Sequence, residues 1–158
     1  MLKGKGTAND QGAVCAGLVM RSGRHTVEFT IVESQQDDHD GGYVRFLGLA
    51  RPEIDVEQTD ANDTDQFWGL NCISRIVQHR GGFDAWDGQG HFAQSFKGDV
   101  VELLLDCGDG TLTVKKNGVR LGVAITGLTG EFCWEALMVA ESTCKAQVRI
   151  VAADPATF

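Results

Sequence analysis

The chain has 158 residues, of which 42% are hydrophobic and 23% charged, and its net charge is −8. This length and composition are typical of one soluble globular domain that buries about 70% of its unfolded-chain surface. The negative charge argues against a nucleic-acid surface, which needs the opposite sign. The longest uncharged apolar stretch, residues 12–20, is too short to cross a bilayer.

In chain order, the sequence predicts short strands separated by turns. Residues 1–12 hold three glycines and two lysines and read as a flexible lead-in. The strands before the centre of the chain are predicted at residues 13–20, 25–33, 43–50, 67–73 and 75–79. Residues 80–90 contain four glycines, so no regular structure is predicted there.

The central part of the chain predicts an antiparallel meander. Residues 100–105 are apolar except for Glu102, as in a strand that is covered on both faces. The strand at residues 111–115 alternates apolar and polar side chains. Asn117 and Gly118 then form the pair best suited to a two-residue type I′ turn, and residues 119–123 return as a third strand.

The last strands are predicted at residues 132–140 and 146–152. No stretch of twelve residues has helical periodicity, so about ten short strands indicate an all-β sandwich. We therefore predict a single domain over residues 13–153, followed by a tail at residues 154–158.

The negative charge is concentrated in one part of the chain. Residues 33–65 hold ten acidic residues against Arg45 and Arg51, which gives −8, while the remaining twelve acidic and twelve basic residues cancel. The predicted strand at 43–50 divides this part into two acidic segments, 33–42 and 52–66. They are either a solvated face that aids solubility or part of a surface for a basic partner.

Motifs for catalysis, metals and disulfides are absent from the sequence. The five cysteines include no Cys-x-x-Cys pair, so neither a disulfide framework nor a zinc site is predicted. Asp60 begins a segment like a calcium loop, but this segment lacks the glycine and glutamate that such a loop needs. Nucleophile and phosphate-loop motifs are missing as well. We therefore predict a monomer that is not an enzyme and needs no cofactor, and, because no signal segment is seen, an intracellular and cytoplasmic location.

Several motifs occur in an order that resembles one known family. They are Ser-Gly-Arg-His at 22–25, a Val-to-Arg strand at 44–51, Trp-Gly-Leu at 68–70, Asp-Gly-Thr-Leu at 109–112, and Asn-Gly at 117–118 followed by Leu-Gly-Val-Ala. Together they resemble the SPRY domain pattern over roughly residues 14–151. The resemblance implies a bent antiparallel β-sandwich of two sheets with a concanavalin-like jelly-roll architecture.

The resemblance also implies a non-catalytic module that recognises peptides or partner surfaces through loops at one end of the sandwich. Carried over residue by residue, its binding segments fall on Gln78, His79, Arg80, Glu141, Ser142 and Thr143. The aromatic anchors of the family are missing at these positions. We therefore add Phe83 and Trp86, which lie with Arg80 in the glycine-rich segment and either stand in the binding surface or fold back onto the edge of the core. Trp68 and Trp134 lie within strand runs and are predicted to be core residues.

We interpret the chain as a protein-interaction module within a larger protein, with one binding surface formed by segments 78–86 and 141–143 at the same end. Its partner is a protein or peptide, with basic residues if the acidic segments contribute. The alternative is a carbohydrate-binding, lectin-like sandwich with a calcium-assisted loop at residues 37–40, because fold alone does not separate these functions.

Overall fold

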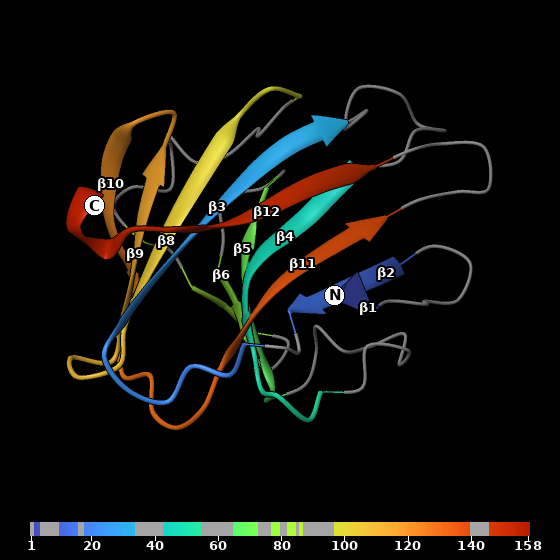
Figure 1. The fold of residues 1–158 in the computed structure, drawn as a ribbon. Helices are drawn as coiled ribbons and strands as arrows, with labels where there is room; N and C mark the ends of the chain where they lie inside the picture. The colour runs from blue at the N-terminus through green and yellow to red at the C-terminus, as the bar shows by residue number, and fades with distance from the viewer. Residues whose placement is uncertain are drawn as a thin grey trace.

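The computed structural model describes residues 2–3, 10–15, 18–33, 43–54, 65–72, 77–79, 82–84, 86, 97–139 and 146–158. In these residues two antiparallel sheets pack against each other as a β-sandwich, which confirms the predicted fold class (Figure 1). Within this part of the chain, none of the helical structure has the length and apolar character needed to cross a membrane.

The described residues contain twelve strands. They are β1 Leu2–Lys3, β2 Asp10–Cys15, β3 Arg24–Glu33, β4 Tyr43–Ala50, β5 Phe67–Asn71, β6 Val77–His79, β7 Gly82–Asp84, β8 Val100–Asp106, β9 Thr111–Lys116, β10 Val119–Ile125, β11 Cys133–Val139 and β12 Gln147–Ala153. One sheet has seven strands in the order β1-β2-β11-β4-β5-β6-β7. The other has five, in the order β10-β9-β8-β3-β12.

The core lies between the two sheets and follows from the alternation of side chains along each strand. In β3, Val27, Phe29 and Ile31 are buried in this core, whereas Glu28 and Thr30 between them are partly exposed. Other strands of both sheets contribute Leu47, Leu49, Leu70, Val101, Leu103, Leu105, Leu112 and Val114. The alternating apolar positions in the sequence therefore identify which face of each sheet points into the core.

The beginning of the chain differs from the prediction of a loose lead-in. β2 begins at Asp10 and pairs with β11, with Asp10 opposite Val139, and Leu2–Lys3 pairs with β2 in turn. Glycine and polar residues have low strand propensity, but β11 offers these residues a strand edge to pair with. Residues 10–15 therefore form a strand because they pair with β11, which is distant in the sequence.

The glycine-rich segment also contains regular structure. β7, at Gly82–Asp84, pairs with β6, so the prediction of no regular structure over residues 80–90 is wrong for these three residues. Glycine weakens a strand without forbidding one, and here an adjacent strand supplies the backbone partners.

The end of the chain forms a 3₁₀ helix, η2, over Pro155–Thr157, where a tail was expected. Asp154 caps it, because its side chain accepts a hydrogen bond from Ala156 N at 2.9 Å. The segment lies beside the five-stranded sheet (Figure 1). Lys115 Nζ of β9 is 4.7 Å from the centre of the Phe158 ring. These contacts hold the last residues against the domain.

The predicted hairpin between β9 and β10 is confirmed. Asn117 and Gly118 have φ values of 50° and 80°, as a type I′ turn requires. Asn117 also secures the neighbouring strand, since its Oδ1 accepts a hydrogen bond from Val100 N and its Nδ2 donates one to Asp99 Oδ1, both at 2.9 Å. The turn residues therefore join three consecutive strands of the meander.

Replacing Gly118 with Val should lower the free energy of unfolding by about 1 kcal/mol or more. A Cβ atom at this position would meet no heavy atom within 4 Å, so the cost comes from the positive φ and not from a clash. Gly118→Asn is the matched control, because Asn tolerates this backbone conformation. Urea denaturation of the two variants measures the difference, and equal midpoints for Gly118→Val and the parent would show that the turn carries no such constraint.

Candidate functional site

The first predicted binding segment lies on the hairpin formed by β6 and β7. Gln78 of β6 is opposite Gly69 of β5, and His79 is opposite Gly82 of β7. The hairpin therefore turns beyond His79. This is the end of the seven-stranded sheet at which β4 finishes, with Ala50 opposite Phe67.

His79 is held in a fixed position at this end. Its ring stacks on the indole of Trp68, with centroids 4.3 Å apart and an interplanar angle of 11°. Its Nδ1 lies 2.8 Å from the backbone oxygen of Phe67 and carries the proton in this contact, because a carbonyl oxygen only accepts. Both rings are partly buried. The pair therefore forms an ordered aromatic ledge beside the hairpin turn.

Arg51, which follows β4, contacts the Trp68 ring of this ledge. Its guanidinium carbon lies 4.8 Å from the centre of the Trp68 ring and 4.5 Å from that of Phe132. Its Nη1 donates to the backbone oxygens of Thr129 and Glu131 at 2.7 and 3.0 Å. Arg51 thus fixes the segment before β11 to the aromatic side chains of β5 by charge-assisted hydrogen bonds and cation–π contacts.

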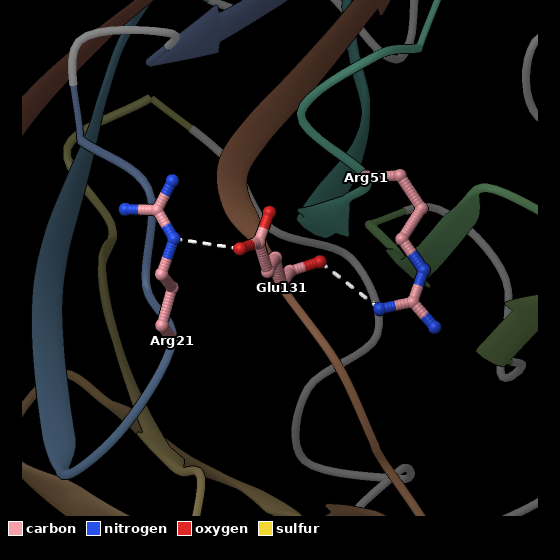
Figure 2. A network of polar contacts seen from close by, with 3 residues as sticks. All are labelled: Arg21, Arg51 and Glu131. Carbon is pink, nitrogen blue, oxygen red and sulfur yellow. Dashed lines mark hydrogen bonds and ion pairs between the residues drawn. The ribbon is translucent and has the colours of Figure 1, made fainter.

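Glu131 connects this group to the other sheet. Its carboxylate accepts a hydrogen bond from Arg21 Nε at 2.6 Å, while its backbone oxygen accepts from Arg51 (Figure 2). Arg21 precedes β3 of the five-stranded sheet, and Arg51 follows β4 of the seven-stranded sheet. The Arg21 and Glu131 side chains are 65% and 49% exposed, so the pair adds little stability and mainly orients the segment.

We call the six residues of this group the arginine–aromatic cluster; they are Arg21, Arg51, Trp68, His79, Glu131 and Phe132. Gly130, which directly precedes Glu131, has a φ of 91°, and a Cβ atom there would lie 2.7 Å from Arg51 Nη1. Only glycine fits this close approach without displacing the guanidinium. The glycine at position 130 therefore leaves the space that the Arg51 guanidinium occupies.

The predicted tryptophans take different positions. Trp134 is buried in the core, as predicted, and Trp68 is a partly buried member of the cluster. Trp86 is partly buried and packs against the core between the sheets, which favours the alternative of a side chain folded onto the core edge. For Gln78 and Phe83 only the strand positions are described, and Arg80, Glu141, Ser142 and Thr143 lie outside the described residues.

The strands around segment 141–143 leave the sandwich at its other end. β11 finishes at Val139, opposite Tyr43 at the start of β4, and β12 begins at Gln147, opposite Glu33 at the end of β3. The β6–β7 hairpin turns at the end of the sheet at which β4 finishes, with β5 between them. This register corrects the expectation that the hairpin turn and the segment between β11 and β12 share one end.

Metal and thiol chemistry have little support in the described part of the chain. No group of three or more His, Cys, Asp or Glu side chains there could hold a metal ion. Residues 37–40, on which the calcium-assisted alternative depends, lie outside this part. Burial raises the pKa of the Cys72 thiol to about 12, so this cysteine stays a neutral thiol at neutral pH and is a poor nucleophile.

Comparison with known proteins identifies the family. The chain is 32% identical to the F-box/SPRY domain-containing protein 1 of Drosophila melanogaster over 131 residues, which are 77% of this chain and 47% of that protein. It is 37% identical to the protein of the same name from Culex quinquefasciatus over 97 residues, 55% of this chain and 36% of that protein. The fold matches the SPRY domain of human HERC1 with a TM-score of 0.72 and 19% identity, over 96% of this chain and 87% of that one. The chain belongs to the SPRY domain family.

The match covers one domain of the relatives and not their whole length. A scan against family models found no match. The chain spans about half the length of the curated F-box/SPRY relatives. Membership of the SPRY family indicates a protein-interaction module, since SPRY domains in general serve that role.

Replacing Arg51 with Ala should destabilise the domain by about 1–2 kcal/mol, because it removes two hydrogen bonds and two cation–π contacts. Lys at this position keeps the charge but not the planar fork, so it should restore only part of the loss. Chemical denaturation measures both variants. Arg120, an exposed residue of β10, provides the matched control, and an Arg51→Ala midpoint as high as that of Arg120→Ala would exclude a supporting role for Arg51.

Proposed function

We propose that this SPRY domain is a non-catalytic, intracellular interaction module that recognises a peptide segment or the surface of a partner protein, and that it is one part of a longer protein. The family supports the first part of this proposal. The length of the relatives, whose printed name combines an F-box with a SPRY domain, supports the second. The lectin-like alternative has no support in the comparisons, which return SPRY proteins.

We place the recognition surface at the end of the sandwich that carries the arginine–aromatic cluster and the β6–β7 turn. The observation that carries this choice is the His79–Trp68 stack, which is partly buried and whose indole ring is contacted by Arg51. Aromatic and arginine side chains are the usual anchors of protein interfaces. Side chains that are ordered before binding lose less conformational entropy when a partner docks. Such a ledge is suited to an extended peptide or a loop of a partner.

If this surface binds the partner, His79→Ala and Arg80→Ala should each weaken binding by about 1–3 kcal/mol without unfolding the domain. The probe is a peptide selected from a random library by the parent domain, and its affinity is measured by calorimetry. Trp86→Ala should instead lower the melting temperature and leave the affinity of the folded fraction unchanged, because Trp86 packs against the core.

Val151→Thr tests the opposite possibility, since Val151 is an exposed apolar residue of β12, in the five-stranded sheet. Loss of peptide binding in this variant, with binding retained in His79→Ala and Arg80→Ala, would place the recognition surface on that sheet instead.

The net charge of −8 suggests that the partner carries basic residues. Opposite charges speed the encounter of two proteins, and salt screens them over about 8–10 Å at physiological ionic strength. The association rate with a basic peptide should therefore fall as sodium chloride is raised from 50 to 500 mM. Stopped-flow or surface-plasmon kinetics would show this, and a rate that is independent of salt would exclude a contribution from the acidic segments.

A further inference from the structure

Glu135 lies on the outer side of the seven-stranded sheet, within an apolar layer. Its neighbours along β11, Trp134 and Ala136, belong to the core between the sheets, so alternation directs Glu135 to the other face. Leu137, two residues further on, belongs to a second apolar cluster with Phe46 and Phe67, against which Ile54 packs. The rings of Phe46 and Phe67 meet edge to face with centroids 5.4 Å apart. Glu135 thus shares its face of the sheet with large apolar side chains.

The carboxyl group of Glu135 is fully buried and has no polar partner. Its relative exposure is 0%, and neither side-chain oxygen has a hydrogen-bond partner among the described residues. The residues opposite it are Gly48 on β4 and Val14 on β2, and neither type has a side-chain donor. A buried carboxylate without donors costs far more free energy than a buried neutral carboxylic acid.

No hydrogen bond from a charged side chain of the described residues compensates for this burial. On β4, the guanidinium of Arg45 lies over the Phe46 ring, 5.2 Å from its centre. On β2, Asp10 is opposite Val139, four residues along β11 from Glu135, and on β1, Lys3 is opposite Val14, two strands from Glu135. β5 has no charged residue over Phe67–Asn71. Burial therefore raises the pKa of Glu135 from its ordinary value of 4.5 to about 8, and burial is the single cause.

We propose that Glu135 is a neutral carboxylic acid at neutral pH and makes the fold less stable as the solution becomes less acidic, because loss of its proton places an unpartnered charge inside the apolar layer of the seven-stranded sheet. β11 stands between β2 and β4, so β1 and β2 reach the rest of the sheet through β11 alone. Ionisation of Glu135 therefore weakens the attachment of the N-terminal strands to the domain.

The direction of the pH effect follows from proton binding. The folded state holds this proton up to a higher pH than the unfolded state does. The stabilising contribution is therefore complete below about pH 4.5 and is lost as the pH rises to about 8. Within this window the unfolding equilibrium constant increases by up to about tenfold for each pH unit.

The test compares the complete chain with Glu135→Gln, which keeps the shape of the side chain but cannot ionise. Urea denaturation is measured from pH 5 to pH 9. Between pH 5.5 and pH 7.5, the unfolding constant of the parent should rise about 70-fold relative to that of Glu135→Gln. Glu53→Gln, at an exposed glutamate, is the matched control and should follow the parent curve. Parallel curves for the parent and Glu135→Gln would overturn the proposal.

A measurement on the parent protein keeps the test decisive if Glu135→Gln does not fold. Carbon-13 spectra of the glutamate side-chain carboxyl groups, recorded over the same pH range, should contain one resonance that titrates near pH 8. If every glutamate carboxyl in the folded protein titrates below pH 6, Glu135 is ionised at neutral pH and the proposal is wrong.

Discussion

The seven-stranded sheet has apolar side chains on both faces, and this double burial constrains much of the structure. On its inner face, Leu47, Leu49 and Trp134 pack against the five-stranded sheet. On its outer face, the Phe46–Phe67–Leu137 cluster forms a separate layer. Most of the described residues of β4, β5 and β11 are therefore buried, which restricts the size and polarity of the side chains that these strands can carry.

Two glycines show this restriction. A Cβ atom at Gly48 would overlap the backbone oxygen of Trp68, and one at Gly69 would overlap the Phe67 ring. The aromatic ring occupies the space above Gly69, and the strands approach closely at Gly48. A larger residue at either position would force the backbone or the ring to move, and because the rings of Phe46 and Phe67 are in contact, a shift at one strand would reach the next.

Sequence patterns predicted those parts of the fold that depend on neighbours in the sequence. The strand at Tyr43–Ala50 and the turn at Asn117 and Gly118 are coded by local alternation and by local backbone preference, and both agree with the structure. β2 was placed three residues late and β7 was missed, because their pairing partners determine them. Asp10 lies opposite Val139, which no local pattern reveals.

The candidate site shows the same limit more strongly. The family pattern indicated His79, but the cluster around it joins residues far apart in the sequence: Arg51 and Glu131 are separated by 80 positions, and Arg21 and Glu131 by 110. Trp68 was correctly placed within a strand, yet its contacts with His79 and Arg51 depend on the register of β5 and β6. A periodic pattern assigns a side chain to a face of the sheet, and only the folded chain assigns it a neighbour.

The arginine–aromatic cluster and Glu135 are connected through β11. Phe132, which contacts Arg51 and Trp68, directly precedes this strand, and its backbone pairs with Met20 of the segment that leads into the five-stranded sheet. Glu135 is three residues further along.

A change that loosens β11 near Glu135 therefore acts on the same strand that positions Phe132, the member of the cluster held by both sheets. Because backbone hydrogen bonds and ring contacts hold Phe132 from both sides, its position depends on β11 remaining paired from its first residue. The order of the proposed recognition surface therefore depends on the stability of β11. The contacts of Phe132 stabilise the beginning of this strand, whereas ionisation of Glu135 destabilises its middle.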